Sequence, residues 1–305
     1  GIPYATEFSL NTPAFSTAAK VYDNILVDLL KAEELLADEG QYEGERAFMT
    51  MRQIHFNVHA VRATLARVYL TMGDYDNALK YANKVIAEGG RTLLKYNEIK
   101  GDVEGILSRK ECIFGIQSST DFYSNVYSDL WLSTSFYSLN PRPDYDAVYT
   151  AGGEEDYRVA AYYETQAVGS VRFVKLIDRY KVNGDEYNRP ADVIQGINMI
   201  RLPEMYYIAS ECLMNKNLLK EAVEMLNKAR ASRGVTEMDV NTTTASMLAD
   251  AINNERYKEL VGEGQTFFNM KRHNMPITTI EGATLSASNN IYVIPIPDVE
   301  YEYRN

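Results

Sequence analysis

The sequence has little cysteine, with two residues among 305, Cys112 and Cys212. They lie far apart in the chain and form no CxxC pair or other metal-ligand spacing. We expect each to be a small buried hydrophobic side chain, and a disulfide between them is the alternative that the spacing leaves open. Cysteine content therefore does not identify the redox compartment.

Long apolar runs and clusters of basic residues are also missing. No stretch approaches the roughly 20 apolar residues that cross a bilayer, and no segment has the basic start and apolar middle of a signal peptide. With 31 basic and 42 acidic residues the formal net charge is -11, and no run of lysine or arginine could neutralise a line of phosphates. We therefore expect no nucleic-acid partner and no transmembrane segment.

What the chain has is apolar residues, which make up 46% of the sequence and are sufficient for a large core. No Pro/Gly/Ser-rich linker or charge block separates two halves, so we predict a single domain over residues 1–305. Within it we expect first helical repeats at 16–89, an aromatic-rich insert at 95–198, second helical repeats at 200–275 and an extended C-terminal tail at 276–305.

Apolar residues that recur every three or four positions predict helices. The predicted helices cover residues 16–37, 52–72, 75–87, 203–231 and 245–261. Gly73, directly after the second of them, is a typical C-terminal stop. The predicted fold class is therefore mainly α.

A pattern of small and large residues occurs twice in these segments. Leu65-Ala66 and Tyr69, followed by Ala78 and Ala82, match a tetratricopeptide hairpin, in which small residues let two helices approach closely. The pattern returns later in the chain at Ala209-Ser210, Leu213, Ala222 and Leu226. We therefore predict tetratricopeptide-like helical hairpins that stack around a continuous core and are separated by a long loop-rich insert.

The insert at 95–198 is rich in aromatic residues and includes the single tryptophan of the chain. Short β segments are predicted within it at 112–116 and 171–176. Sugar rings present apolar C–H faces that stack on aromatic side chains, while their hydroxyls bind polar groups. The candidate glycan-binding residues are Trp131, Tyr127, Tyr123, Phe136, Tyr137 and Tyr145. The alternative is that these rings pack the insert onto the helices, as most large aromatic residues do.

His55 and His59 are spaced as i and i+4 on a predicted helix, a spacing that can hold zinc. The glutamate that follows the first histidine of a zinc-protease motif is absent, and His273 is far away in the sequence. We therefore expect a pair on the helix surface, with no metal and no cofactor.

Glu255 and Glu259 are one turn apart on a predicted helix, and a carboxylate pair can act as acid and base on a glycosidic bond. Glutamates at this spacing are common on solvated helices, and Arg256 and Lys258 supply ion-pair partners. The sequence also lacks the GxSxG, P-loop and GxGxxG motifs. We therefore favour a structural ion network over a glycosidase and predict no catalytic residues.

Four ordered blocks of sequence carry a family resemblance. They are residues 60–88, residues 201–211 with 226–235, residues 252–272, and Ile294-Pro295-Ile296-Pro297. The first reads AVRATLARVYLTMGDYDNALKYANKVIAE, the second begins RLPEMYYIASE and the third begins INNERYKEL. Together they resemble the first hairpin, the later helical blocks and the closing "(L/I)-P-I-P" of the SusD/RagB family. The chain departs from the family pattern at Gln265-Thr266, where arginine is more usual after Glu-Gly, and at Asn269, where aspartate is favoured.

The resemblance implies a SusD-like α-α superhelix that is not an enzyme and uses no cofactor. It implies a lipid-anchored protein on the extracellular face of a Gram-negative outer membrane, which captures oligosaccharide or polysaccharide and hands it to a SusC-like TonB-dependent transporter. It also implies a framework role for Glu255, Arg256 and Glu259. The opening Gly1-Ile2-Pro3-Tyr4 resembles a segment that follows an N-terminal helical region in the family, so we expect the lipid anchor and part of the ligand site to lie outside this chain.

Two alternatives to glycan capture stay open. One is capture of peptides, as in RagB-like proteins, and the other is a tetratricopeptide-type scaffold that binds only proteins. The family's ligand-binding residues follow no transferable motif, so the six aromatic candidates rest on aromatic density alone.

Overall fold

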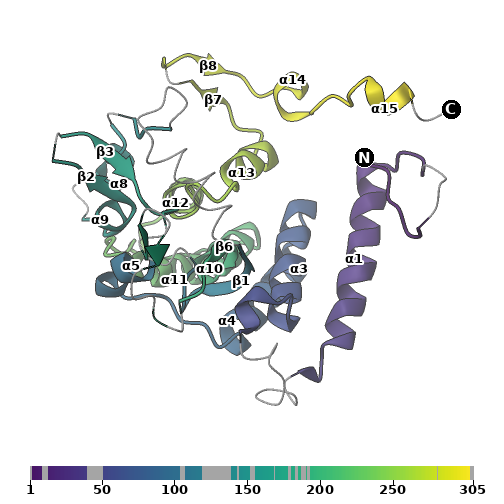
Figure 1. The fold of residues 1–305 in the computed structure, drawn as a ribbon, viewed down its shortest axis with the longest axis horizontal. Helices are drawn as coiled ribbons and strands as arrows, with labels where there is room; N and C mark the ends of the chain where they lie inside the picture. The colour runs from purple at the N-terminus through teal and green to yellow at the C-terminus, as the bar shows by residue number, and fades with distance from the viewer. Residues whose placement is uncertain are drawn as a thin grey trace.

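The computed structural model confirms that the fold is mainly α, with short strands between the helices (Figure 1). The residues that the structure describes are 2–8, 13–39, 51–103, 107–118, 139–142, 144–151, 155–167, 169–177, 180–182, 185–186, 190, 193–279 and 281–302. No helix in these ranges has both the length and the apolar character that crossing a membrane requires.

The first helices form a hairpin with one additional helix beside it. They are α1 (Ala18–Leu35), α3 (Val58–Met72) and α4 (Tyr75–Glu88). Asn57 caps α3, and α3 ends at Gly73, whose φ of 79° is in the left-handed region that favours glycine. Asp74 then caps α4 by accepting the backbone N–H of Asn77. These caps fix the tight turn, and the hairpin predicted from the residue pattern is confirmed.

The start of α3 differs from the prediction. Arg52–Ile54 form a short 3-10 helix, η2, and His55 after it has an extended backbone. The Asn57 side chain donates to the carbonyl oxygens of Arg52 and His55, at 2.8 and 3.2 Å, and this arrangement delays the α-helix until Val58. The prediction that His55 and His59 share a helix is therefore wrong. Among the described residues, no group of three or more His, Cys, Asp or Glu side chains is arranged to hold a metal ion.

The second half of the chain repeats the hairpin in α10 (Leu202–Asn215) and α11 (Leu219–Ser232), which confirms the predicted repeat. α10 packs against both α4 and α11. The small residues Ala66, Ala78, Ala209 and Ala222 are all 0% exposed. Their lack of bulk therefore permits the close helix contacts that the pattern predicted.

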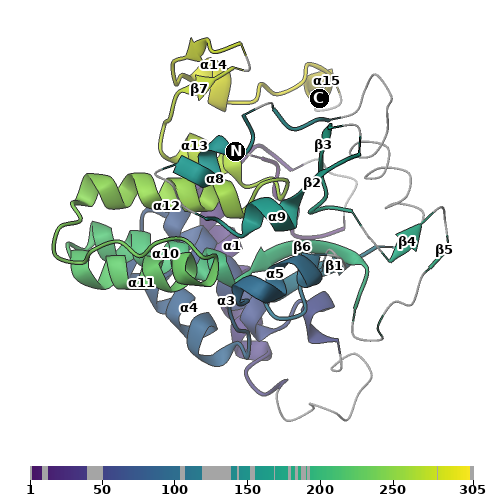
Figure 2. The same cartoon turned by 90° about the vertical axis from the view of Figure 1, so that its left-hand side faces the viewer.

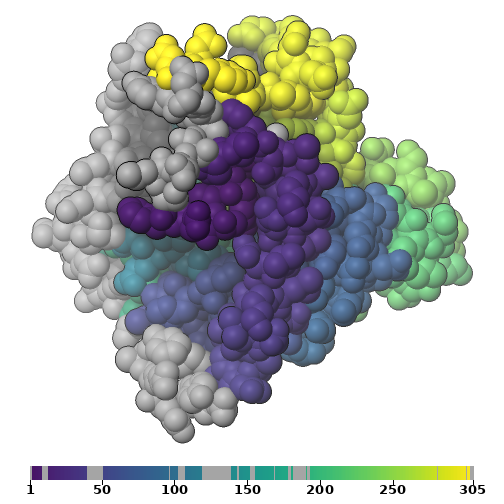
Figure 3. Space-filling view, turned by 90° about the vertical axis from the view of Figure 1, so that its right-hand side faces the viewer, coloured from purple at the N-terminus to yellow at the C-terminus, as the bar shows by residue number. Residues whose placement is uncertain are grey.

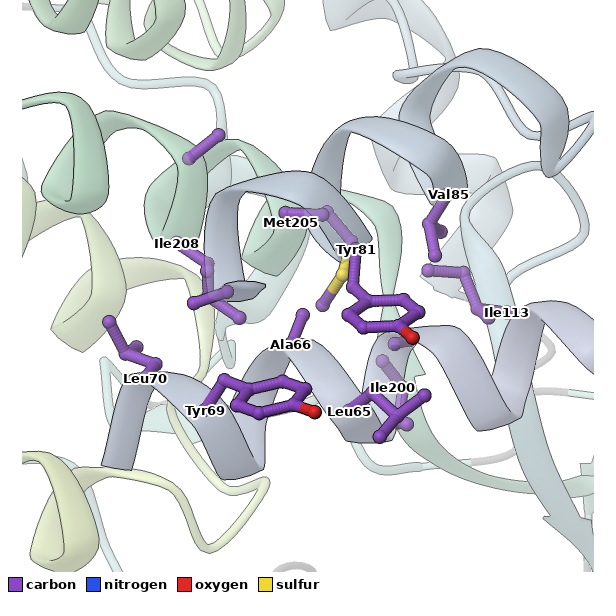
Figure 4. Packing of buried hydrophobic residues seen from close by; sticks show 14 of the residues in the cluster. Leu65, Ala66, Tyr69, Leu70, Tyr81, Val85, Ile113, Ile200, Met205 and Ile208 are labelled. Carbon is purple, nitrogen blue, oxygen red and sulfur yellow. The ribbon is translucent and has the colours of Figure 1, made fainter. Parts of the chain in front are cut away.

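The core between the two hairpins is apolar and closely packed. Leu65 and Leu70 on α3 share one buried cluster with Met205 and Ile208 on α10 (Figure 4). The rings of Tyr69 and Tyr81 stack with their centroids 5.7 Å apart and cover one side of this core.

A third layer is made by α12 (Ala245–Glu259), which packs against α10 and α11 (Figure 2). The short helix α13 (Thr266–Arg272) follows it. Thr244 caps α12 by accepting the N–H of Met247 at 3.3 Å. The predicted helix at 245–261 is confirmed to within two residues at its end.

Two paired strands join the insert to the helices. β1 (Cys112–Gln117) is antiparallel to β6 (Gly196–Arg201), so the two ends of the insert lie side by side. β2 (Tyr163–Thr165) pairs with β3 (Val171–Phe173), and β4 (Lys181–Val182) with β5 (Asp185–Glu186). The strand predicted at 171–176 stops at Phe173, since the next residue donates its N–H to Tyr162 and the chain turns. Three short helices complete the described part of the insert: α5 (Tyr96–Val103), α8 (Ala147–Thr150) and α9 (Arg158–Tyr162).

The C-terminal segment returns toward the start of the chain. It is more structured than the extended tail that we predicted, with β7 (Ile277–Thr278) paired with β8 (Thr284–Leu285), α14 (Asn289–Tyr292) and α15 (Val299–Glu302). The ring of Tyr301 lies 6.2 Å from that of Phe15, centroid to centroid. Figure 3 shows this neighbourhood, with α1 and the N-terminal segment beside the yellow C-terminal segment.

Both cysteines are buried and carry free thiols, in agreement with the prediction of small buried side chains. Burial raises the pKa of the Cys212 thiol to about 12, so this side chain stays protonated at neutral pH.

Candidate ligand-binding site

The two glutamates considered as a catalytic pair lie at the centre of a buried ion network. Glu259 is 0% exposed and accepts hydrogen bonds from Arg158 at 3.1 Å, Arg201 at 2.6 Å and Arg233 at 2.9 Å. Burial alone would raise the pKa of Glu259, but Arg233 and Arg201 outweigh it and hold this pKa well below its usual value. A carboxylate enclosed in this way is a framework group.

Glu255 is equally buried. It accepts a hydrogen bond from Arg158 at 2.7 Å and forms an ion pair with Lys258 at 2.9 Å. The structural network favoured from the sequence is therefore present, but our reason for it was wrong, because both glutamates face the interior and neither is on a solvated face. Most of their partners come from distant elements, α9, β6 and the end of α11, which the one-turn spacing could not reveal.

The network attaches the insert to α12. Tyr162 donates its hydroxyl hydrogen bond to Glu259 at 3.2 Å, and Tyr149 donates to the carbonyl of Lys258 at 3.2 Å. Both rings are 1% exposed. For these two aromatic residues the packing interpretation holds, and neither is available to a ligand.

The face of α12 opposite the network borders a hollow of about 350 Å³. Its walls come from α12 and the residue after it, from the start of α13, from the segment around β7 and from the insert. The lining residues are Asn253, Asn254, Arg256, Tyr257, Leu260, Gln265, Thr266, Asn269, Met270, residues 275–278 and Arg142. We call it the α12–α13 pocket. Ion pairs bury one face of α12 in the interior, and the opposite face of the helix lines this pocket.

The pocket carries groups that suit a polar, ring-shaped ligand. Asn253, Asn254, Gln265 and Asn269 bring amide groups, and the ring of Tyr257 is 49% exposed. Two methionines and a proline add apolar surface. A hydrogen bond of 2.9 Å from the Asn269 amide to Asn253 Oδ1 orients two of the amides. Aromatic and amide groups together can hold the C–H faces and the hydroxyls of a sugar.

One of the six predicted aromatic residues lies beside this pocket. Tyr145 closes a turn with Arg142, its N–H donating to the Arg142 carbonyl at 3.1 Å, and its ring lies 4.5 Å from that of Tyr163. Burial raises the pKa of Tyr163, a hydrogen bond with Tyr149 lowers it, and the phenols of Tyr257 and Tyr145 raise it. The other five candidates, Trp131, Tyr127, Tyr123, Phe136 and Tyr137, lie outside the described residues and stay a prediction.

The amide residues of the pocket were not predicted from the sequence. A usable indication was present, since Gln265-Thr266 and Asn269 depart from the family pattern and all three residues line the pocket. The others could not be found because Asn253 and Tyr257 resemble any polar positions on an amphipathic helix.

Comparisons with known proteins agree with this architecture. A family model described as SusD family matches residues 146–302, and a tetratricopeptide repeat model matches residues 60–87, which lie within α3 and α4. No curated protein sequence matches the chain.

Three solved structures with the same fold come from the genus Bacteroides. A SusD superfamily protein from Bacteroides thetaiotaomicron is 24% identical, with a TM-score of 0.75, over 99% of this chain and 69% of that chain. A SusD-like carbohydrate binding protein from Bacteroides vulgatus is 17% identical, with a TM-score of 0.73 and the same coverage. A putative sugar binding protein from Bacteroides vulgatus is 22% identical, with a TM-score of 0.74, over 99% of this chain and 68% of that chain. At these identities the likeness shows the fold.

Proposed function

Since the chain belongs to the SusD family, we propose that it is a non-enzymatic binding protein that captures glycan at the cell surface and delivers it to a SusC-like TonB-dependent transporter. In this proposal the protein works on the extracellular face of the outer membrane, to which a lipid anchor attaches it. The similar structures described as carbohydrate or sugar binding support the choice of ligand class.

The observation that carries the proposal is the α12–α13 pocket. An exposed phenol ring, Tyr257, stands beside four amide side chains in a preformed hollow. A preformed site limits the ordering that binding requires, so ring stacking with a few hydrogen bonds gives useful affinity for a sugar. The glutamates that could have cleaved a glycosidic bond are enclosed in ion pairs, which favours capture over hydrolysis.

Affinity electrophoresis against plant, host and microbial polysaccharides tests the proposal. We expect at least one polysaccharide to retard the chain, and Tyr257→Ala to abolish the retardation. Tyr301→Ala is the matched control, because Tyr301 is 54% exposed but lies on α15, outside the pocket. Trp131→Ala, run alongside, reports whether the aromatic insert contributes to the same site.

No retardation of the parent chain by any polysaccharide would contradict the proposal and favour peptide capture or a protein-binding scaffold. The delivery step has its own test. The protein should co-purify with a SusC-like transporter. A chain that binds glycan but associates with no such transporter would limit the proposal to capture.

A further inference from the structure

Two amides of the α12–α13 pocket have a fixed hydrogen-bond polarity, which begins at Glu211 on α10. The Glu211 carboxylate is 2% exposed and accepts hydrogen bonds from both terminal nitrogens of Arg272. A guanidinium only donates. Its Nη2 also donates to the amide oxygen of Asn269 at 2.8 Å. The oxygen of Asn269 therefore faces Arg272, and the amide nitrogen of Asn269 points away from it.

Asn269 transmits this polarity to Asn253 on α12. The Asn269 Nδ2 donates to the amide oxygen of Asn253 at 2.9 Å, so the Nδ2 of Asn253 lies on the side away from Asn269. Asn253 is half-buried and lines the pocket. No described residue accepts a hydrogen bond from its Nδ2, and this atom is not one of the fully enclosed polar atoms of the structure. Asn253 therefore offers the pocket an accessible donor of fixed orientation.

An aspartate at position 269 would reverse this polarity. Aspartate is the residue that the family pattern favours here, and this chain departs from it with Asn269. One carboxylate oxygen would still accept from Arg272, but the other would face Asn253 in place of an N–H donor. The Asn253 amide would then turn to donate its Nδ2 to the carboxylate, and its oxygen would be left for a ligand. Asn269 thus decides whether Asn253 presents a donor or an acceptor.

The rest of the pocket suits a neutral group with an apolar end. Residues 275–277, which are methionine, proline and isoleucine, form an apolar wall, and no aspartate or glutamate is among the described lining. Both arginines of the lining are already paired, Arg142 with Asp144 at 3.0 Å and Arg256 with Glu211 at 3.6 Å. The cost of desolvating an anion would therefore not be offset by a free cation.

We infer that the α12–α13 pocket selects saccharides that carry an N-acetyl group, whose carbonyl oxygen accepts from Asn253 Nδ2 and whose methyl group contacts the apolar wall at 275–277. The inference rests on the proposed function and specifies its substrate class. A carbonyl oxygen only accepts, so it matches a donor of fixed orientation. A hydroxyl both donates and accepts, so it can bind either orientation of the Asn253 amide. The orientation of Asn253 therefore matters for an acetamido group and not for the hydroxyl that replaces it in other sugars.

Calorimetric titration with matched pairs of saccharides tests the inference. One pair is a chito-oligosaccharide and the cello-oligosaccharide of the same length, which differ only in the acetamido or hydroxyl group at C2 of each ring. The other pair is the methyl glycosides of N-acetylgalactosamine and galactose. We expect the acetamido member of at least one pair to bind about tenfold more tightly, because it adds one well-matched hydrogen bond and one buried methyl group.

Asn269→Asp is the decisive variant because it reverses the Asn253 amide without replacing that residue. It should lower the affinity of the acetamido member about tenfold and leave the hydroxyl member within about twofold. A purely structural role of Asn269 would weaken both members alike. Asn253→Asp, which removes the donor itself, should cause the same selective loss. Asn83→Asp makes the same chemical change at an exposed position on α4 and should leave both affinities unaltered.

The outcomes separate the inference from the function on which it rests. Equal affinity within both pairs, or tighter binding of the hydroxyl members, overturns the inference and leaves glycan capture standing. A preference for the acetamido member that survives Asn269→Asp and Asn253→Asp overturns the assignment to this donor. If none of the four saccharides binds, the inference fails, and if no polysaccharide retards the chain either, the proposed function fails with it.

Discussion

Two regions of the interior are stabilised by different interactions, apolar packing in one and buried ion pairs in the other. Between α3, α4 and α10 the interface is apolar, with Leu65 and several alanines at 0% exposure. Beneath α12 the interior holds guanidinium and carboxylate groups, among them Arg158, Arg233 and Glu259, at 1% exposure or less. The first region depends on residue size and the second on charge pairing across distant segments. Helix packing therefore makes the frame, while ion pairing fixes where the insert sits on it.

This difference has energetic consequences. Apolar packing is non-directional. When a methyl group is removed, neighbouring side chains can move into the space and limit the decrease in the free energy of unfolding. Buried charges have a large desolvation cost that only complete pairing offsets, so the removal of one partner leaves the others uncompensated. The network should thus be the more fragile of the two regions.

Glu259→Gln should have the largest effect, because it keeps the shape of the side chain but removes the charge shared by three arginines. We expect the free energy of unfolding to fall by about 3–5 kcal/mol, as measured by urea denaturation. Glu224→Gln, an exposed glutamate on α11, is the control and should change it by less than about 0.5 kcal/mol. A loss below about 1 kcal/mol for Glu259→Gln would mean that the network does not stabilise the fold as proposed.

Leu65→Ala tests the apolar region in the same assay. Leu65 is 0% exposed between the hairpins, and a loss of about 3 kcal/mol is expected from lost burial and the cavity left behind. Leu35→Ala on α1 is the matched control, since Leu35 is 71% exposed and should contribute less than about 0.5 kcal/mol. Equal losses for the two variants would contradict the location of the core.

Asn57→Ala removes a local polar contact from the helical frame. The Asn57 side chain accepts the N–H groups of His59 and Ala60 at 2.9 and 3.1 Å. Loss of a cap lowers helix stability by about 1 kcal/mol, well below the effect of Glu259→Gln. Asn57→Ser should recover most of the loss, and failure to do so would assign the effect to the other hydrogen bonds of Asn57.

The free energy of unfolding should depend on pH in both regions but over different pH ranges, and the change caused by His59 in the helical frame should be the smallest effect predicted. Burial, together with the nearby charges of Arg62 and Arg52, lowers the pKa of His59 on α3 from 6.5 to about 4. Between these two pH values the unfolded chain binds a proton at His59 and the folded chain does not. The contribution of neutral His59 to the free energy of unfolding is therefore complete above about pH 6.5 and is lost as pH falls toward 4. His59→Gln should flatten the stability curve in that window, in urea denaturation at several pH values.

The network responds at lower pH. Its arginines and Lys258 hold the pKa values of Glu259 and Glu255 below the usual 4.5, so their stabilisation is present above that value and is lost as pH falls below it. Burial raises the pKa of Glu111 in the same network, and this carboxyl acts in the opposite direction. If His59→Gln has the same dependence of unfolding free energy on pH as the parent chain between pH 6.5 and 4, a group other than His59 titrates in that range.

The frame could be predicted from the sequence to a large extent because its determinants are local. The spacing of Ala66, Tyr69 and Ala78 gave the first hairpin, and Gly73 gave its turn. The start of α3 could not be predicted, since it depends on which carbonyl groups the Asn57 side chain contacts.

The network and the pocket were harder to predict for a different reason. The spacing of Glu255 and Glu259 indicated ion pairing, but their partners Arg158 and Arg201 lie on other elements, and only the folded chain brings them together. The pocket combines α12, α13 and Arg142 in the same way. The aromatic candidates stay a prediction, and they included none of the amide residues that line the pocket.

The short β1–β6 ladder has a consequence for how such a protein evolves. It brings the ends of the insert together, with the N–H of Ser118 donating to Gln195 at 3.2 Å. For a loop with fixed ends, each doubling of length costs only about 0.6 kcal/mol. The insert can therefore change in length between the segments that carry Tyr149, Arg158 and Lys175, which hold it to α12, while the hairpins beside it are inherited unchanged. A lineage can vary these connecting loops without rebuilding the helical frame.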